Sequence, residues 1–433
     1  MNKLICLLAI ICFSFCGSCA IATELSADEK KIMAYVEDQI EQEAKFLEQV
    51  VNINSGTKNF DGVRNVATVF SDALEQAGLK SSWLEMEHTI NRAGHVVAKT
   101  PSTGSPKGQK LLLMGHMDTV FPKDSAFQKY EQRGDFAFGP GIQDMKGGIV
   151  VIVYALKALH ETGLLKDRQI TVFLTGDEED TGQPIEKSRE ALVQVAKQSD
   201  VALNFEGGGE GYAVVARRGY TNWELTVKGV RAHSGWVFSE DTGAGAANET
   251  ARILNEFYTH LRSENSLTFN TGMMMAGTNY DYNQRSSTGS IFGKTNVVPS
   301  KAYIRGDIRA LSIEQLNRVQ NKMRRIVADN LPQTSAEINF RTSYPPMPET
   351  RGNASLFQQL NQVSVDLGQK PLTKIDPKKR GAADISFVAP YVASLDGLGP
   401  WGDGEHSLAE KMDLTSLKPV TQRAAILIYR LTR

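Results

Sequence analysis

Short apolar runs alternate with helical patterns through the first half of the chain. Residues 94–98, 110–114, 169–174 and 201–205 are apolar stretches bounded by turn residues, which is typical of strands buried on both faces. Residues 26–50 and 64–77 carry apolar side chains at helical spacing, whereas 149–159 fits either a buried strand or a buried helix. This alternation predicts an α/β sheet with helices on both faces.

The pattern changes from about Val214. Residues 223–230, 301–308 and 335–342 alternate as half-exposed strands, and 246–261 and 312–326 are amphipathic. The order predicts a small α+β sandwich, ferredoxin-like in its β-α-β-β-α-β succession, inserted into a larger domain. The predicted boundaries give a discontinuous catalytic domain at 23–213 and 344–433 and an inserted domain at 214–343.

The first residues read as a targeting segment. Lys3 provides a positive start, residues 4–15 are apolar but too short to span a bilayer, and Ala20-Ile21-Ala22 fits a cleavage site. We therefore expect a signal peptide at residues 1–22, no stable membrane insertion, and a periplasmic or secreted protein. Lipidation at Cys19 is the alternative, which Cys16 disfavours because Leu is usual at that place.

The composition limits the kinds of catalysis and the partners that we expect. All four cysteines precede Thr23, so the mature chain has no thiol for cysteine catalysis or zinc–thiolate binding. The 433 residues include 48 Lys plus Arg and 49 Asp plus Glu, and this balance gives no reason to expect nucleic acid as a partner. The length favours two domains.

Metal-capable side chains follow the predicted strands or stand beside glycines. Ligands gather beyond the carboxyl ends of strands in such sheets, and three of these segments directly follow apolar runs. Two imidazoles and three carboxylates suit two divalent cations, and a set of N and O ligands without sulfur favours zinc while admitting Mn or Co. The candidate ligands are His116, Asp144, Glu179, Glu206 and His406.

Two further carboxylates stand next to members of this set. Asp118 is two residues from His116, so in an extended segment it can accept the second ring N–H of that histidine. Glu178 and Glu179 are adjacent, so one can bind metal while the other faces water as a general base with a raised pKa. Each motif alone is commonplace, but five such segments together indicate a metallohydrolase.

The motifs occur in the order of a known family. They are GHMDTV, FGPGIQDMKGG, TGDEEDTG, FEGG, VKGVRAHSG, TNVVPSKA with DIRA, and GPWGDGEHS. The chain thereby resembles the M20 metallopeptidases, and most of all their glutamate carboxypeptidase branch. The resemblance implies a zinc-exopeptidase-like catalytic domain with a mixed sheet, two Zn²⁺ per subunit, and a lid domain through which the protein forms a homodimer.

The resemblance also implies roles for the metal-site residues. His116 and Glu206 would hold different metals, Asp144 would bridge them, and His406 would complete the second site. Glu178 would be the general base. The peptide bond after Asp144 would be cis.

Other expected roles lie outside the metal set. His233 would stabilise the oxyanion in the partner subunit's site, and Arg309 would grip the substrate's carboxylate. Asn296 and Gly381 would add hydrogen bonds. The chain departs from the family where Ala382 and Ala383 replace a hydroxyl residue, and residues 279–290 form a longer stretch that we expect to reshape the pocket.

The sequence therefore predicts a di-zinc exopeptidase that cleaves an amide next to a free carboxylate, with a peptide or N-acyl amino acid as substrate. A carboxypeptidase is the leading interpretation. An aminoacylase or dipeptidase using the same site is the second. A metal-dependent binding protein without catalysis is the third, and the intact Glu178 argues against it.

Overall fold

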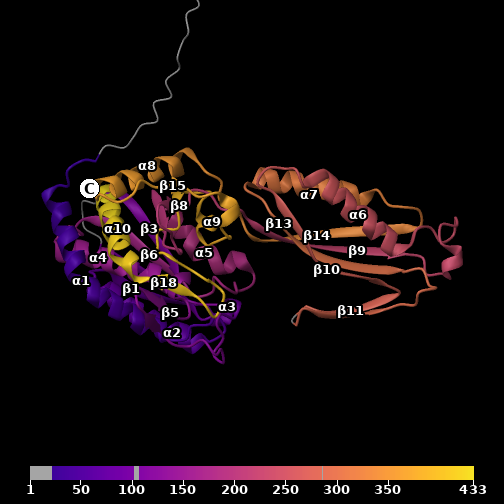
Figure 1. Cartoon of the computed structure of the whole chain (residues 1–433), viewed down its shortest axis with the longest axis horizontal. Helices are drawn as coiled ribbons and strands as arrows, with labels where there is room; N and C mark the ends of the chain where they lie inside the picture. The colour runs from indigo at the N-terminus through magenta and orange to yellow at the C-terminus, as the bar shows by residue number, and fades with distance from the viewer. Residues whose placement is uncertain (1–21, 102–106, 285) are drawn as a thin grey trace, which may run out of the picture.

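The chain folds into two lobes that lie end to end. The computed structural model describes residues 22–101, 107–284 and 286–433, and the predicted leader with its four cysteines, apart from Ala22, lies outside them. The larger lobe comprises the described residues of 22–219 and 345–433, and the smaller lobe those of 220–344 (Figure 1). Among the described residues, no helix is both long and apolar enough to cross a membrane.

Helices and strands alternate through the larger lobe, which confirms the α/β prediction. The elements that precede the smaller lobe are α1 (Ala27–Val51), α2 (Phe60–Gln76), β1 (Lys80–Glu85), α3 (Glu87–Ile90), β2 (Gly94–Lys99), β3 (Lys107–His116), β4 (Glu131–Arg133), β5 (Phe136–Phe138), η1 (Ile142–Lys146), α4 (Gly147–Glu161), β6 (Arg168–Thr175), α5 (Ile185–Ala196), β7 (Val201–Asn204) and β8 (Tyr212–Ala213). Those that follow it are α8 (Arg351–Asp366), β15 (Thr373–Lys374), η3 (Pro377–Lys379), α9 (Ile385–Val388), β16 (Ala393–Leu395), β17 (Gly402–Asp403), β18 (Lys411–Asp413), η4 (Leu414–Ser416) and α10 (Leu417–Thr432).

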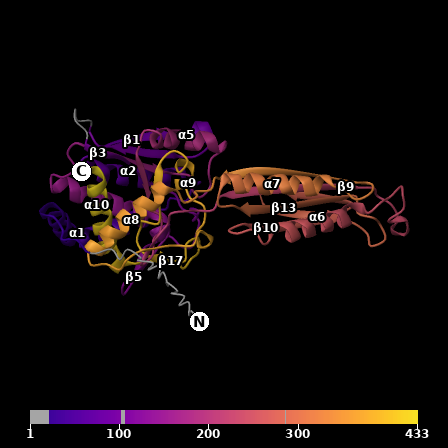
Figure 2. The ribbon, with the colours of Figure 1, turned by 90° about the horizontal axis from the view of Figure 1, so that it is seen from above.

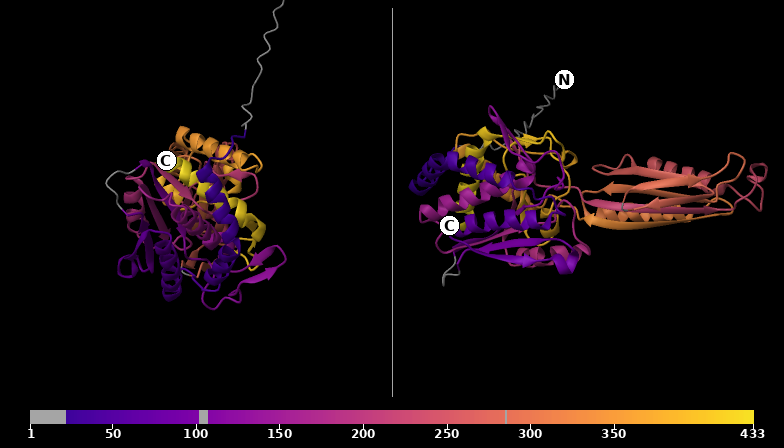
Figure 3. Two further views of the ribbon diagram at one scale, coloured as in Figure 1. Left: turned by 90° about the vertical axis from the view of Figure 1, so that its left-hand side faces the viewer. Right: turned by 90° about the horizontal axis from the view of Figure 1, so that it is seen from below.

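A mixed sheet in the order β1-β2-β6-β3-β7-β16 forms the centre of the larger lobe. Strand β3 runs parallel to both β6 and β7. Its side chains alternate between two cores: Leu111 and Leu113 pack with α1, α2, α4 and α10, whereas Leu112 and Met114 pack with α5 and α9. The uninterrupted apolar run thus reflects burial on both faces, with helices on each side (Figure 3).

The segment that fitted either a strand or a helix is the helix α4. Nearly all of its residues are buried, so it lacks the polar face that would reveal helical periodicity. Gly148 lets the first turn approach the strand β7 region, because a Cβ there would lie 1.8 Å from the carbonyl oxygen of Phe205. The helix therefore packs tightly beneath the edge where β3 and β7 end.

The smaller lobe has a sheet and a hydrophobic core of its own. Its sheet order is β10-β13-β9-β14, and Trp223 and Phe257 are at the centre of its core. Helices α6 and α7 cover one face of the sheet (Figures 1 and 2). Its elements are β9 (Tyr220–Gly229), η2 (Ser234–Trp236), α6 (Gly245–Leu261), β10 (Thr268–Gly277), β11 (Asn279–Asn283), β12 (Thr288–Phe292), β13 (Lys301–Arg309), α7 (Ile313–Ala328) and β14 (Thr334–Tyr344).

The longer polar stretch at 279–290 forms most of the hairpin β11–β12. Tyr280 in this hairpin stacks on Tyr303 of β13, with ring centroids 5.3 Å apart. The expectation that this stretch reshapes the pocket is wrong, because none of its described residues lines the cavity described below. The aromatic side chains at alternate positions of this hairpin, Tyr280 and Tyr282, pack instead on Tyr303 in the sheet of the smaller lobe.

A buried carboxyl group in α1 makes the stability of the larger lobe depend on pH. Glu43 is fully buried and accepts a hydrogen bond from the Thr421 hydroxyl of α10 at 2.6 Å. Burial raises the pKa of Glu43 from 4.5 to about 8. The protonated form therefore contributes stability that is complete below about pH 4.5 and is lost as the pH rises to about 8.

We expect Glu43→Gln to lie close to the wild type in free energy of unfolding at pH 5 and to exceed it by several kcal/mol at pH 8. The amide keeps an acceptor for Thr421 but cannot ionise. Urea unfolding at both pH values measures the effect, and Glu41→Gln, on the exposed side of the same helix, is the control. An equal gap between wild type and Glu43→Gln at the two pH values would contradict the assignment.

Candidate metal centre

Three neighbouring strands deliver candidate ligands to one edge of the sheet. His116 is the last residue of β3 and pairs in register with Thr175 at the end of β6. Glu178 and Glu179 follow β6, and Glu206 follows β7. Because these strands are parallel and adjacent, their carboxyl ends meet at the same edge, as the sequence pattern predicted.

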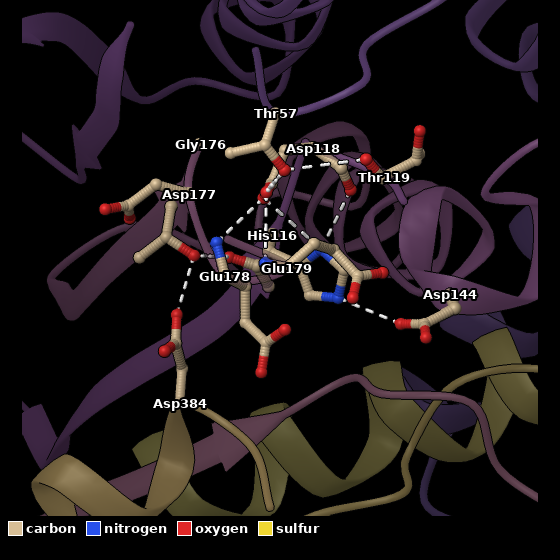
Figure 4. A network of polar contacts seen from close by, with 12 residues as sticks. Thr57, His116, Asp118, Thr119, Asp144, Gly176, Asp177, Glu178, Glu179 and Asp384 are labelled. Carbon is tan, nitrogen blue, oxygen red and sulfur yellow. Dashed lines mark hydrogen bonds and ion pairs between the residues drawn. The ribbon is translucent and has the colours of Figure 1, made fainter. Parts of the chain in front are cut away.

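Asp144 lies between two imidazoles. It belongs to η1, just before α4, and the peptide bond that follows it is cis as expected. Its Oδ1 is 2.9 Å from Nε2 of His116, and its Oδ2 is 3.0 Å from Nε2 of His406 (Figure 4 shows the His116 side). The two oxygens of one carboxylate thus face two different nitrogen ligands, which is the arrangement that a bridging carboxylate requires.

Each of the two imidazoles also lies close to a second carboxylate. Oε1 of Glu206 is 3.6 Å from Nε2 of His116, and Oε2 of Glu179 is 3.2 Å from Nε2 of His406. The expectation that His116 and Glu206 would hold different metals is therefore wrong. They lie on the same side of Asp144 because β3 and β7 are adjacent parallel strands whose ends are neighbours.

Asp118 holds the loop after β6 in addition to facing His116. The ring Nδ1 of His116 is 3.0 Å from the backbone oxygen of Asp118 and 3.6 Å from its Oδ1. The Asp118 carboxylate accepts the backbone N–H groups of Glu178 at 3.0 Å and Glu179 at 3.1 Å, and the Thr57 hydroxyl at 2.6 Å (Figure 4). One buried carboxylate thereby positions both glutamates relative to the histidine.

The cluster holds more negative charge than its surroundings neutralise. Burial raises the pKa of Glu179 to about 7 and that of Glu206 to about 8, and the charge of Asp144 adds to both rises. Burial also raises the pKa of Glu178 well above its usual range. Hydrogen bonds to Asp144 and Glu179 raise the pKa of His406 to about 11.

These shifts, together with the donor set, fit divalent cations. One donor atom each from His116, Asp144 and Glu179 lie within 4.8 Å of one another. His116 with Glu206 and His406 with Glu179 offer two groups of donors that share Asp144. Nitrogen and carboxylate oxygen without sulfur are what zinc-type cations accept, and positive ions would offset the negative charge of these buried carboxylates.

A cavity of about 320 Å³ opens onto this cluster. Glu178 lines it together with Asp144, Glu179, Glu206 and His406. Gly381 lines it as well, so the structure brings this predicted residue to the site, and its carbonyl accepts a hydrogen bond from Nη1 of Arg217 at 2.8 Å. The Glu178 carboxyl group, whose pKa is raised, thus borders a cavity large enough to hold part of a substrate.

The other predicted residues lie in the smaller lobe. Arg309 ends β13, pairs with Asp307 at 3.0 Å and stacks on Tyr220 at 4.2 Å. Tyr220 in turn pairs with Tyr344, whose hydroxyl donates to the Glu178 carbonyl at 2.7 Å. Arg309 is therefore at the end of the smaller lobe that adjoins the cavity.

His233 and Asn296 lie together, away from the cluster. Ser234, next to His233, donates its backbone N–H to the Asn296 carbonyl at 2.9 Å, and His233 forms a bridge with Val297. Both positions lie beyond the Gly229 end of β9, and ten residues of strand span roughly 30 Å. The described residues of one chain do not bring them to the metal-site candidates.

Sequence reasoning missed several residues that hold the site. Glu410 is fully buried and its carboxylate accepts the backbone N–H groups of Gly141, Gln143 and Asp144 at 2.8–3.1 Å. It lies four residues after His406, and that spacing is the only signal that linked it to the site. Thr57 and Arg217 had no such signal, since both lie in segments without a metal-ligand pattern.

Comparison with known proteins gives a consistent result. The model of Peptidase family M20/M25/M40 matches residues 112–430. Carboxypeptidase G2 of Pseudomonas sp. (strain RS-16) is 26% identical over 396 residues, covering 89% of this chain and 88% of that protein.

Solved structures share the fold. Aminopeptidase PepT from Bacillus cereus superposes with a TM-score of 0.73 at 17% identity, covering 91% of this chain and 99% of that one. YXEP of Bacillus subtilis, described as a dinuclear metal-binding peptidase of the M20 family, superposes with a TM-score of 0.64 at 13% identity, covering 92% and 99%.

Proposed function

The chain belongs to Peptidase family M20/M25/M40, and on that premise we propose that this hydrolase is a two-metal exopeptidase that cleaves an amide next to a free carboxylate. The observation that carries the proposal is Asp144 placed between two imidazole–carboxylate groups, with Glu178 beside them on the same cavity. Carboxypeptidase action is the form we favour. Its relative carboxypeptidase G2 supports that choice.

The metal ligands follow from the two donor groups. His116 and Glu206 would hold one ion, His406 and Glu179 would hold the other, and Asp144 would bind both. We propose that the ions are zinc. Such ions supply Lewis acidity to the scissile amide and to water. The protein's part is to hold the five ligands rigidly, through Asp118 behind His116 and Glu410 behind Asp144.

Glu178 is the proposed general base. Its carboxylate takes a proton from the water whose oxygen bonds to the amide carbon. When the C–N bond breaks, the same group delivers that proton to the leaving nitrogen, which gives a free amine and a carboxylic acid; the acid then loses its own proton and leaves as a carboxylate. A base that works near neutral pH needs a raised pKa, and burial provides this for Glu178.

The substrate's terminal carboxylate is assigned to Arg309, since a guanidinium binds a carboxylate through two parallel hydrogen bonds. We further propose a homodimer in which His233, remote from its own cluster, reaches the partner's site. We also propose a periplasmic or secreted location, from the positive start, apolar run and cleavage-site pattern of residues 1–22.

Matched substrates test the exopeptidase assignment. We expect the metal-loaded protein to hydrolyse N-acyl amino acids or peptides with a free terminal carboxylate about 10- to 100-fold faster than their terminal amides, because a charged hydrogen-bonded pair is lost. Arg309→Ala should remove most of that difference, whereas Arg305→Ala on the same strand should keep it. Equal hydrolysis of acids and amides would contradict the assignment.

The same panel separates the alternatives. A carboxypeptidase cleaves longer peptides from the carboxyl end. A dipeptidase requires a substrate of two residues with a free amino group on the first, and an aminoacylase prefers N-acyl amino acids. Rates on these three classes of substrate decide among them.

A further inference from the structure

The backbone on both sides of the Glu178 Cα is held by hydrogen bonds to side chains. The Asp118 carboxylate accepts the N–H groups of Glu178 at 3.0 Å and Glu179 at 3.1 Å (Figure 4). The Tyr344 hydroxyl donates to the Glu178 carbonyl at 2.7 Å. Because a peptide unit is planar, the unit between Glu178 and Glu179 is held at both its N–H and its C=O group. These bonds together set the direction in which the Glu178 side chain leaves the backbone.

The two ends of this loop are attached to other side chains of the larger lobe. The N–H group of Gly176 donates to Nδ1 of the buried His95 at 3.3 Å, and that of Gly182 donates to the buried Asp177 carboxylate at 2.9 Å. Asp177 is fixed in turn by an ion pair with the buried Arg189 at 2.5 Å. The ends of the loop are therefore anchored without Tyr344, whereas the carbonyl in its middle is not.

Tyr344 stands where the two lobes are joined. It is the last residue of β14 and pairs with Tyr220, the first residue of β9. Just beyond this pair, Arg217 and Met347 exchange backbone hydrogen bonds at 2.8 and 2.9 Å, so the two connecting segments run side by side in opposite directions. The Tyr344 ring nevertheless packs in the larger lobe, with its centroid 5.1 Å from that of Phe387 in α9. A residue of the smaller lobe's sheet thus reaches the loop that carries the proposed base.

The Tyr344 hydroxyl is suited to hold the backbone rather than to exchange protons. Burial raises the pKa of Tyr344 well above its usual range, and the charges of Glu178 and Asp384 add to the rise. The hydroxyl therefore keeps the proton that it donates to the Glu178 carbonyl, and its oxygen lies 3.0 Å from the Thr181 hydroxyl. Tyr344 is not among the described residues that line the cavity at Glu178, so contact with a substrate there is not its role.

We propose that Tyr344 is a positioning residue: from the joint between the lobes, its hydroxyl holds the Glu178 carbonyl and so fixes where the carboxylate of the general base stands. The inference rests on the proposed function, in which Glu178 is the base, and adds a residue that acts through it. A displacement of about 1 Å can cost a catalytic group on the order of 100-fold in rate, and a released carbonyl allows part of such a shift. Loss of the hydroxyl should therefore lower kcat and leave KM almost unchanged.

Tyr344→Phe removes the hydroxyl and keeps the ring that packs on Phe387. On a substrate found with the panel above, we expect about 5- to 30-fold lower kcat of the zinc-loaded protein, with KM within about twofold and bound zinc unchanged. Tyr282→Phe is the matched control, because it removes a tyrosine hydroxyl that accepts from Arg305 at 2.9 Å inside the smaller lobe, and it should retain the wild-type kcat. Melting temperatures check that both variants are folded. An unchanged kcat in Tyr344→Phe would overturn the inference.

A double-mutant cycle separates positioning of the base from a general loss of structure. If Tyr344 acts through Glu178, adding Tyr344→Phe to Glu178→Gln should lower the residual kcat by about twofold or less, because the base that Tyr344 positions is already absent. An equal loss of kcat in both backgrounds would overturn the inference, since the hydroxyl would then act independently of the base.

Hydrogen exchange distinguishes failure of this inference from failure of the proposed function. In the zinc-loaded protein, the peptide that covers residues 176–182 should exchange about fivefold faster or more in Tyr344→Phe than in the wild type, while β3 should not change. Faster exchange of this loop, without hydrolysis of any substrate by the wild type, would overturn the proposed function and keep the contact. Hydrolysis by the wild type, with equal exchange and equal kcat in Tyr344→Phe, would overturn the positioning role and keep the proposed function.

Discussion

Glu178→Gln should lower kcat of the metal-loaded protein by about 10²- to 10⁴-fold, the range over which a positioned acid–base group contributes. The amide has the same shape as the carboxyl group but cannot accept the proton of water or return it to the leaving nitrogen. The backbone of residue 178 keeps its hydrogen bonds to Asp118 and Tyr344, so the loop retains its place.

The measurement is kcat on a peptide or N-acyl amino acid, with bound metal counted in the same sample. Glu405→Gln is the matched control, because this carboxylate also borders the cavity but is exposed. We expect the control to stay within a few-fold of wild type. If the Glu178→Gln protein binds its metals and keeps more than a tenth of the wild-type kcat, Glu178 is not the base.

The ligands at strand ends were predictable because a parallel sheet brings the ends of its strands together. An apolar run such as 110–114 can be recognised without knowing its neighbours, and the residue that follows it must lie at the sheet edge. His116 and Glu206 were found in this way. Which ligands share a metal was not predictable, because it depends on strand order, and sequence alone does not place β7 beside β3.

The supporting residues could not be predicted for a related reason. Glu410 acts on backbone N–H groups about 270 positions earlier in the chain, and no local pattern marks such a contact. Arg217 and Arg380 line the cavity from segments that carry no metal-ligand pattern. The helix α4 was ambiguous because a helix buried on all sides carries no polar face.

The larger lobe alone does not contain all the proposed groups. Arg309 is at the end of the smaller lobe nearest Glu178, while His233 lies beyond the far end of β9, whose ten residues span roughly 30 Å. A site assembled from both lobes, and from a second copy, would form completely only around a bound substrate.

Metal removal should lower activity about as strongly as the loss of Glu178. Lewis acidity is worth several kcal/mol in amide hydrolysis, so we expect a chelator to lower activity by roughly 10³-fold or more. Removing the ions also leaves Glu179 and Glu206 with the raised pKa values that their burial imposes. Zinc should restore activity, and manganese or cobalt should restore part or all of it if the site accepts them.

The most direct test of the two-metal claim is a titration of the metal-free protein with zinc chloride, in which bound zinc and hydrolysis of one N-acyl amino acid or peptide are followed together. The geometry around Asp144 predicts that binding saturates at two ions per chain and that full activity is reached only as the second site fills. Saturation of both binding and activity at one ion, or full activity in the protein freed of metal, would contradict it.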